Sequence, residues 1–439
     1  MPDIIPITTC FARLMTTTDL KRLRQIVLAM LCMTGRVTMV GLSRWTQKGG
    51  SYRTLQRWFV SRVEWGAVLW AVVEAHLIHA GGMYLLAVDE VVVSKAGKMT
   101  HGVGRFYSSI AGRPIGGVSF VAASLVDVGQ RRSYPVQVEQ RLPRPKATAP
   151  AGETVKRGRG RPKGSKNHAK SAPLLSAELM VLDGLLCGLL KRIGVLQVKH
   201  LVMDGFFGNY PTTWLAAQHG LHLISKLRHN AVLFFPYTGP KPRRGPTPRY
   251  GQRLDYRALP LDARTSVVSE GHFVTETYVL TLLHKDFSDP LNVVVIAKTD
   301  TRSRKRSHVV LFSTDLSLSP AHLADYYALR FQIEFNFRDA KQYFGLEDFM
   351  NVSQPAVTNA VGLSFLMVNL SAILLQAHRA DSTDFSILDL KALFRARRYL
   401  HETIIALPEP LPPNIISSIW YRFTALGAIR PLDNFRNAA

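Results

Sequence analysis

Short apolar runs that end in an acidic residue stand out in the hydrophobic pattern of this chain. The run Met83–Val88 ends at Asp89, and the run Val198–Met203 ends at Asp204. Runs of this length predict buried strands, because a strand covered on both faces carries apolar residues without polar alternation. Each acid is therefore predicted to lie at the end of a buried strand.

The segments around these two runs predict an α/β domain. Two further strands, Gly117–Val128 and Ser133–Gln140, follow the first run and would form an antiparallel three-strand meander with it. A helix at about 174–193 precedes the second run, and a helix over Pro211–His219 and a strand over Leu221–Leu227 follow it. This β-α-β alternation is typical of a sheet with helices packed against it.

A different pattern begins at residue 230, where a loop rich in proline and arginine leads into short β-like runs. These runs are Ser266–Val268, Phe273–Leu283 and Leu291–Ala297. They predict a β-rich insertion that has no core of its own. One more strand, Val309–Phe312, comes next. The chain then continues with three predicted helices, at about 320–346, 356–378 and 385–402.

The first 80 residues predict a helical region. Ser51, which follows a pair of glycines, is the predicted N-cap of a short helix. Two short helices around a glycine turn are typical of a helix-turn-helix, in which Arg53 and Arg57 would contact DNA. A small helical bundle without a DNA contact has the same pattern, so both interpretations stay open.

These changes of pattern divide the chain into four parts. We expect a helical N-terminal DNA-binding region (1–80), an α/β core (81–229 and 301–380), the β-rich insertion (230–300) and a helical C-terminal region (381–439). Residues 353–378 carry no formal charge and are long enough to span a membrane. Polar residues within them, such as Asn359 and Asn369, favour a buried core helix instead. No membrane association is therefore expected.

Composition restricts the kind of partner. The 439 residues include 55 Lys and Arg against 31 Asp and Glu, which gives a net charge of +24. Such an excess favours a polyanion as the partner, most often nucleic acid. The three cysteines fit no zinc spacing, and the pattern of the first residues leads us to expect no signal peptide. We interpret the cysteines as reduced packing residues in a cytoplasmic protein.

The basic residues are concentrated in residues 141–170, where ten Lys and Arg stand against one acid, Glu153. Abundant proline and glycine predict a loop there. Residues 157–166, RGRGRPKGSK, resemble an AT-hook, whose extended core is thin enough for a narrow A·T-rich minor groove. The residues expected to contact that groove are Arg157, Arg159, Arg161 and Lys163. A basic linker that neutralises phosphates without sequence preference is the alternative.

The helix at about 320–346 combines a polar stripe with an otherwise largely apolar surface. At about 100° per residue, four polar side chains fall within about 60° of one another: Tyr327, Arg330, Glu334 and Lys341. A packed helix presents an acid between two cations only where something polar lies opposite. The two candidates are a metal ion and a phosphodiester.

Three carboxylates, those of Asp89, Asp204 and Glu334, could converge on a metal site. Magnesium takes carboxylate oxygens together with water and phosphate, and two ions about 4 Å apart can activate a nucleophile and stabilise a leaving oxygen. Each acid also has an ordinary structural interpretation, either as a strand-end cap or as an ion-pair partner of a neighbouring arginine. Glu90 is a poorer candidate than Asp89, because it points to the opposite face of the strand.

With these residues, the chain resembles the DDE transposases of bacterial insertion sequences. The most specific match is the helix spacing Tyr327-x2-Arg330-x3-Glu334-x6-Lys341, where x is any residue. The segments around the other two acids, 88–91 and 203–208, are also similar to this family. The resemblance spans roughly residues 83–350 and is weaker toward both ends of the chain.

The resemblance implies an RNase H-like α/β fold, in which a mixed sheet is flanked by helices and a β-rich insertion precedes the glutamate. Two Mg²⁺ or Mn²⁺ ions would be bound by the catalytic residues Asp89, Asp204 and Glu334. Phosphates beside the scissile bond would be contacted by Tyr327, Arg330 and Lys341. The partner would be double-stranded DNA, both the terminal inverted repeats of the element and the target. A homodimer would bind it, in the bacterial cytoplasm at the nucleoid.

The expected activity is transposition, in which element ends are cut and the freed 3′-OH is joined to target DNA. Both steps are in-line displacements at phosphorus, so one metal site can serve both. Two alternatives stay open: an RNase H-like DNA nuclease without strand transfer, and a non-catalytic AT-hook DNA-binding protein.

Overall fold

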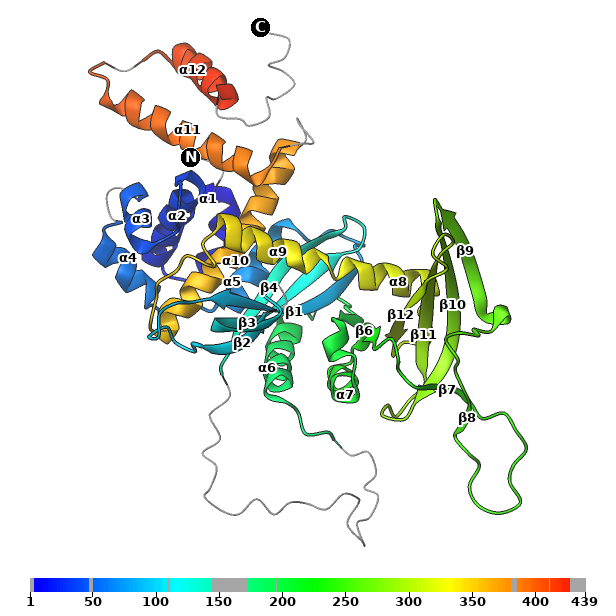
Figure 1. Ribbon diagram of the computed structural model, residues 1–439. Helices are drawn as coiled ribbons and strands as arrows, with labels where there is room; N and C mark the ends of the chain where they lie inside the picture. Colours follow the sequence, from blue (N-terminus) through cyan, green and yellow to red (C-terminus); the bar gives the residue numbers. More distant parts are fainter. Residues whose placement is uncertain are drawn as a thin grey trace, which may run out of the picture.

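One mixed sheet of twelve strands runs through the part of the chain that the computed structural model describes (Figure 1). The described residues are 4–46, 50–108, 111–143, 172–194, 196–379, 385–409 and 411–426. The N-terminal and C-terminal helices lie together on one side, and the strands of the predicted insertion project on the other. The predicted AT-hook, with Arg157, Arg159, Arg161 and Lys163, lies outside the described residues.

The central part of the sheet has the predicted RNase H-like order. Its strands are β1 (Tyr84–Ser94), β2 (Gly104–Ser108), β3 (Arg113–Asp127), β4 (Arg132–Arg141), β5 (His200–Val202) and β6 (His222–Leu227). β1 pairs antiparallel with β3 along its whole length and parallel with β5, which pairs in parallel with β6. β4 pairs antiparallel with β3. The order β4-β3-β1-β5-β6 confirms the mixed α/β fold class and the antiparallel meander.

The sheet continues outward through the predicted β-rich insertion. The elements there are β7 (Leu233–Pro236), β8 (Tyr250–Arg253), η3 (Leu261–Ala263), β9 (Arg264–Glu270), β10 (Phe273–His284) and β11 (Leu291–Asp300). The strand predicted to follow the insertion is β12 (Arg306–Ser313). β12 pairs antiparallel with β6, and β11 and β10 follow it outward. The insertion strands therefore extend the central sheet. β2, β7 and β8 were not predicted, because four or five residues give too short a periodic signal.

Helices cover the sheet and form both ends of the described chain. The N-terminal ones are α1 (Ile4–Ile7), η1 (Thr8–Arg13), α2 (Thr17–Cys32), α3 (Met39–Trp45), α4 (Tyr52–Phe59) and α5 (Trp65–His76). Those within the core are α6 (Ala177–Arg192), η2 (Gly205–Phe207) and α7 (Tyr210–Gln218). The last ones are α8 (Pro320–Leu329), α9 (Gln332–Tyr343), α10 (Gln354–Arg379), α11 (Ile387–Ala406) and α12 (Pro413–Leu426).

The helix expected at about 320–346 is two helices, α8 and α9, and that expectation was wrong in this respect. The amide of Arg330 bonds to the carbonyl of Tyr327 and the amide of Phe331 to that of Ala328, in each case three residues back instead of four. This tighter, 3₁₀-type turn interrupts the α-helix just before Glu334. The angles of a continuous helix therefore do not apply across Arg330.

The long apolar helix α10 is a core helix, as its polar residues predicted. The described chain has one helix, Gln354–His378, that is long and apolar enough to cross a membrane, and 78% of its most apolar window is buried inside the protein. Asn359 Nδ2 donates to the carbonyl of Phe59 at 2.8 Å, and Trp65 Nε1 donates to Asn359 Oδ1 at 2.8 Å. Asn369 Nδ2 donates to the carbonyl of Pro135. These bonds attach α10 to the N-terminal helices and to β4.

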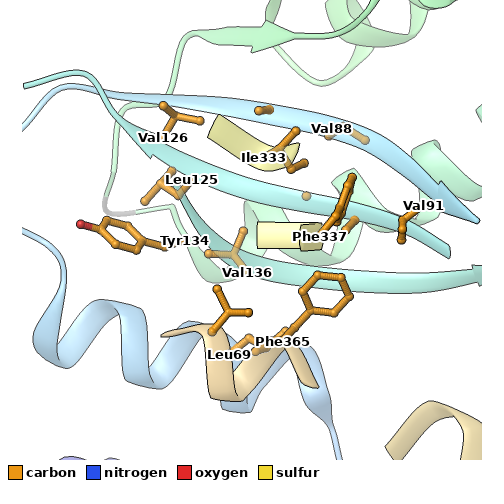
Figure 2. Close-up of a cluster of buried hydrophobic side chains, with 14 of the residues drawn as sticks. Leu69, Val88, Val91, Leu125, Val126, Tyr134, Val136, Ile333, Phe337 and Phe365 are labelled. Carbon is orange, nitrogen blue, oxygen red and sulfur yellow. The ribbon is translucent and has the colours of Figure 1, made fainter. Parts of the chain in front are cut away.

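A buried cluster fixes α9 against the sheet (Figure 2). α9 contacts β1, β3 and β4, while α5 and α10 pack against β4. Ile333 and Phe337, one turn apart on α9, lie in this cluster with Val88 of β1 and Phe365 of α10. Because Ile333 and Glu334 are neighbours on the same turn, packing of the first determines where the second lies.

We predict that Ile333→Ala destabilises the protein by about 2–5 kcal/mol, because Ile333 is fully buried and its loss leaves a cavity. The measurement is the Tm from a thermal scan. Phe331→Ala is the matched control, since Phe331 lies two residues away and is half-exposed. Equal effects of the two substitutions would contradict the role given to this cluster.

Candidate active site

Asp89 was expected at the end of its strand, and this was wrong: it lies in the middle of β1, which continues to Ser94. Its side chain is on the strand face opposite to that of Glu90. Its side chain is 21% exposed, and its Oδ1 accepts a hydrogen bond from the amide of Glu90 at 2.8 Å. Burial raises the pKa of Asp89 to about 6, although the nearby Arg330 acts in the other direction. Glu90, as predicted, points elsewhere and pairs with Arg141, which also pairs with Glu178 of α6.

One guanidinium joins the first and third acids. Arg330 Nη1 donates to Asp89 Oδ2 at 2.9 Å, and Arg330 Nη2 donates to Glu334 Oε1 at 3.0 Å. The arginine side chain is 15% exposed, and its Nε has no hydrogen-bond partner among the described residues. Burial opposes the charge, but the Asp89 carboxylate keeps the pKa of Arg330 above its ordinary value. The structure thus brings Asp89 and Glu334 to the same cation.

Asp204 lies beside these two acids but has different partners. It follows β5 and caps the short helix η2, where its Oδ1 accepts from the amide of Phe206 at 3.0 Å. Its carbonyl accepts from Ser225 Oγ of β6 at 2.7 Å. The negative charges of Asp204 and Glu334 both act to raise the pKa of Asp89, so the three acids share one electrostatic neighbourhood.

The donor atoms of these three acids suit a hard divalent cation, which prefers carboxylate oxygens. Two of the three already bind one positive group, the Arg330 guanidinium. In the described ranges, no three His, Cys, Asp or Glu side chains stand in a metal-ligating arrangement. Arg330 lies where the first and third carboxylates would otherwise meet, so these oxygens could share an ion only if the guanidinium moved.

The other residues of the polar stripe divide into two groups. Tyr327 lies with the acids: burial raises its pKa, Asp204 and Asp89 add to the rise, and Arg330 opposes it. Lys341 of α9 contacts β1 farther along the strand than Asp89. Its Nζ is 3.2 Å from the carbonyl oxygen of Val92 and 3.2 Å from Glu347 Oε1. Val92 is three residues after Asp89, about 10 Å along the strand. The stripe is therefore centred on Arg330, with Lys341 at its margin.

The predicted N-terminal contacts lie far along the chain from this site, on α4. Ser51 caps that helix as predicted, and its Oγ accepts from the amide of Thr54. Arg53 and Arg57 are exposed on α4, and α3 packs beside it. Residues 47–49, which include the first glycine of the predicted turn, lie outside the described chain. The helix-turn-helix stays a prediction.

Two side chains beside Asp204 were missed by sequence reasoning. Phe206 is 71% exposed. Lys226 of β6 is also exposed, and its Cε lies 3.2 Å from where a Cβ on Gly205 would be. A Cβ on Gly208 would overlap the carbonyl oxygen of Lys226, so glycine is needed for this turn to lie on β6. The sequence signal for this turn was the pair of glycines, Gly205 and Gly208, that flank Phe206 and Phe207.

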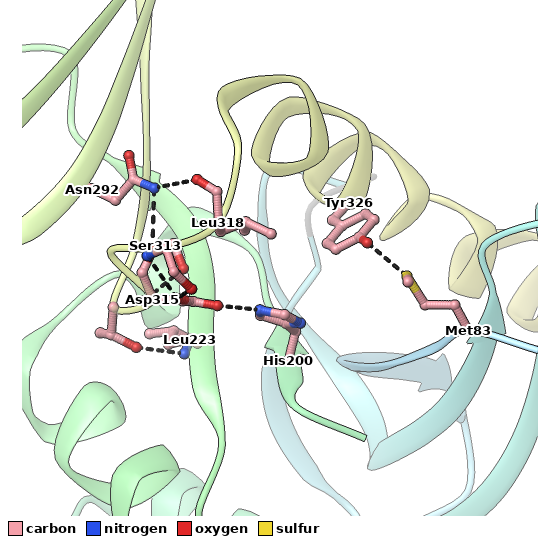
Figure 3. A network of polar contacts seen from close by, with 10 residues as sticks. Met83, His200, Leu223, Asn292, Ser313, Asp315, Leu318 and Tyr326 are labelled. Carbon is pink, nitrogen blue, oxygen red and sulfur yellow. Dashed lines mark hydrogen bonds and ion pairs between the residues drawn. The ribbon is translucent and has the colours of Figure 1, made fainter. Parts of the chain in front are cut away.

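A polar network fixes the start of α8 (Figure 3). His200 Nε2 of β5 lies 3.0 Å from Asp315 Oδ2, and Asn292 Nδ2 of β11 donates to the carbonyls of Leu318 and Asp315 at 2.7 and 3.2 Å. Burial opposes ionisation of Asp315, but hydrogen bonds from Ser317 and His200 hold its pKa at about 2. The network holds the segment that leads into α8 and hence toward Arg330.

A family model described as "DDE superfamily endonuclease" matches residues 10–278, more than half of the chain. The match includes Asp89 and Asp204 and ends before Glu334. Among solved structures, the chain is similar to the piggyBac transposase in a synaptic complex with hairpin DNA. The two share 12% sequence identity with a TM-score of 0.41, and the match covers 93% of this chain and 76% of that one. No curated protein matches the chain.

We predict that Asp315→Asn lowers the Tm at neutral pH. The folded pKa of about 2 lies below the ordinary 3.8, so the carboxylate stabilises the fold above that range and this contribution is lost as the pH falls through it. Thermal scans at several pH values should show that the Tm difference between the variant and the wild type narrows as the pH falls from 3.8 to about 2. Asp262→Asn, on the exposed η3, is the control. A difference independent of pH would contradict the assignment.

Proposed function

This chain belongs to the DDE superfamily endonucleases, and from that membership we propose that it is a transposase. It would cut the ends of a DNA element and join the freed 3′-OH to target DNA. The observation that carries the proposal is the joining of Asp89 and Glu334 by Arg330, with Asp204 close enough to act on the pKa of Asp89. Two acids from distant parts of the chain that share one cation, with a third acid acting on the first, suit phosphodiester chemistry better than an ordinary surface ion pair does.

The proposed metal ligands are Asp89, Asp204 and Glu334, and the proposed ions are two Mg²⁺ or Mn²⁺. When bound, such ions would supply Lewis-acid chemistry at the scissile phosphate. The carboxylates would provide the oxygen ligands, and Asp204 would be oriented by its bond to the amide of Phe206. Arg330 would leave its carboxylate partners and bind a phosphate oxygen instead, because its fork fits either anion.

The first chemical step hydrolyses one phosphodiester bond, and the second exchanges one phosphodiester bond for another. In the first step, a water oxygen attacks phosphorus, the P–O3′ bond breaks, and the products are a 3′-OH and a 5′-phosphate. In the second, that 3′-OH attacks a target phosphorus, a new P–O bond forms, and the target P–O3′ bond breaks. Tyr327 and Arg330 would orient the phosphate beside the acids, and Lys341 would bind a neighbouring phosphate as a point charge.

DNA would be bound by surfaces on several parts of the chain. Arg53 and Arg57 on α4 would contact duplex DNA, and the AT-hook-like segment would enter a minor groove. Beside Asp204, the exposed Lys226 and Phe206 suit a phosphate and a base, respectively. Two element ends must be handled together, so we propose a homodimer on DNA, acting in the cytoplasm at the nucleoid.

We predict that Asp89→Ala and Glu334→Ala each reduce cleavage of duplexes copied from the DNA that flanks the reading frame. Loss of several kcal/mol of transition-state stabilisation corresponds to more than about a hundredfold in rate. DNA affinity should change little. The control is Asp325→Asn, an acid on α8 that pairs with Arg131 away from the acids. Cleavage retained by either alanine variant would exclude this site.

A joining assay distinguishes the proposed transposase from a nuclease without strand transfer. A duplex that already ends in the proposed 3′-OH is mixed with plasmid DNA and Mg²⁺ or Mn²⁺. We predict that the wild-type chain produces joined products and that Asp204→Asn does not. Cleavage without any joined product would support the nuclease. DNA binding with neither activity would support the non-catalytic protein.

A further inference from the structure

Two turns lie side by side at the outer end of the extended sheet. The β9–β10 turn contains Gly271 and His272, and the β11–β12 turn spans 301–305. Phe273 stands opposite Asp300 in the β10–β11 register. The amide of Thr301 donates to the carbonyl of His272 at 2.8 Å, and the Thr301 hydroxyl donates to the same oxygen at 3.0 Å. The two turns therefore form one unit.

This unit carries a dense positive charge. Residues 298–306 contain five exposed cations, Lys298, Arg302, Arg304, Lys305 and Arg306, and a single acid, Asp300. Arg306 pairs with Glu276, and Lys298 lies over the ring of Phe273. Across the described ranges, no ion pair reaches the other three cations. We call Arg302, Arg304 and Lys305 the basic tip.

The one acid of this segment holds the turn in shape. Asp300 Oδ1 accepts from the amide of Arg302 at 2.9 Å, and its Oδ2 accepts from Ser303 Oγ at 2.7 Å. The amide of Asp300 also donates to the carbonyl of Lys305 at 2.9 Å. With its carboxylate occupied in this way, Asp300 organises the basic tip without neutralising the three side chains.

The backbone of the tip contains a conformation that does not suit arginine. Arg304 has φ +54°, in the left-handed region. An L-residue there costs about 1–2 kcal/mol relative to the ordinary region, and glycine or asparagine would fit more easily. The turn itself does not need an arginine at this position. A strained position that carries an exposed cation is consistent with a role outside the turn, and the charge of Arg304 suits an anion.

The strand register sets the distance from the basic tip to the acids. Phe312 of β12 stands opposite Ser225 of β6, and Ser225 donates to the carbonyl of Asp204. From Phe312 back to Arg306 is six residues, about 20 Å of strand. β12 and β6 are antiparallel, so the tip lies beyond the end at which β6 terminates, just after Lys226. The basic tip lies just beyond Arg306, so its distance from Asp204 is about 20–25 Å. This distance corresponds to about six or seven base pairs of B-DNA.

We propose that the basic tip binds the sugar-phosphate backbone of duplex DNA about six or seven base pairs from the scissile phosphate. This rests on the proposed function, because the spacing is measured from the acids. The ligand is the phosphodiester backbone, because arginine and lysine side chains on a short turn neutralise phosphates whatever the base sequence. The three charges lie on one turn, and the bonds of that turn to His272 limit the ordering cost of binding.

The first test measures the salt dependence of DNA binding. Full-length protein is titrated, without divalent metal, into a labelled mixed-sequence duplex of about four helical turns, and anisotropy gives the affinity at several salt concentrations. The variant is Arg302→Gln with Arg304→Asn and Lys305→Gln, in which asparagine tolerates the positive φ. Three lost phosphate contacts should reduce the slope of log K against log salt by about 2.7.

Two controls make this test specific. Arg302→Lys with Arg304→Lys and Lys305→Arg keeps the charge and should keep the slope. Lys21→Gln with Lys191→Gln and Lys199→Gln removes equal charge from other exposed positions and should also leave it unchanged. Tm values identify any variant that has unfolded. An unchanged slope in the folded tip variant would overturn the proposal.

The second test measures position. A DNA-cleaving reagent is tethered at His272→Cys on the adjacent turn, in a Cys187→Ser background, and the cuts are mapped on the flank-derived duplex. They should centre about six or seven base pairs from the enzyme's own cut. Tethered cuts at another distance would overturn the proposed placement. If the wild type makes no cut of its own, the proposed function fails, while the salt slopes still decide whether the tip binds DNA.

Discussion

The site depends on the contact of one partly buried guanidinium with two carboxylates. Arg330 joins Asp89 in the middle of β1 to Glu334 on α9, and without it Asp89 would be a partly buried acid facing two other negative charges. Breaking such a pair by removing one partner is costly, because the remaining charge is left in a poorly solvated place. The position of α8 and α9 on the sheet therefore depends on whether Asp89 and Glu334 stay paired with Arg330.

The same contact relates the fold to the proposed chemistry. The 3₁₀-type turn at Arg330 and Phe331 interrupts the helix where the arginine reaches the strand, and Ile333 fixes the following turn in the core. A guanidinium fork fits a carboxylate and a phosphate equally well. In the proposed mechanism, Arg330 would hold Asp89 and Glu334 together before DNA binds and would exchange to a phosphate oxygen if these carboxylates bound metal ions. The extended sheet then provides a rigid arm from Asp204 toward the basic tip.

Much of this fold could be predicted, because its strands are apolar runs with clear ends. β1, β3, β4, β6 and β10 to β12 lie where the pattern places them, and Ser51 caps its helix as expected. The interruption at Arg330 could not be predicted, since residues 327–334 keep a helical pattern through it. Sequence also could not predict the Arg330 bridge, because Asp89 is 241 residues away. The three cations of the basic tip are close in the sequence, but the bonds that tie their turn to the β9–β10 turn are visible only in the structure.

The central claim is tested most directly by titrating the full chain with Mn²⁺ in the presence of duplex DNA and detecting the bound ion by electron paramagnetic resonance. If Asp89, Asp204 and Glu334 form one metal site, alanine at any of the three should weaken Mn²⁺ binding strongly, whereas Asp325→Asn should bind as the wild type does. Equal Mn²⁺ affinity in the wild type and all three alanine variants would contradict the account.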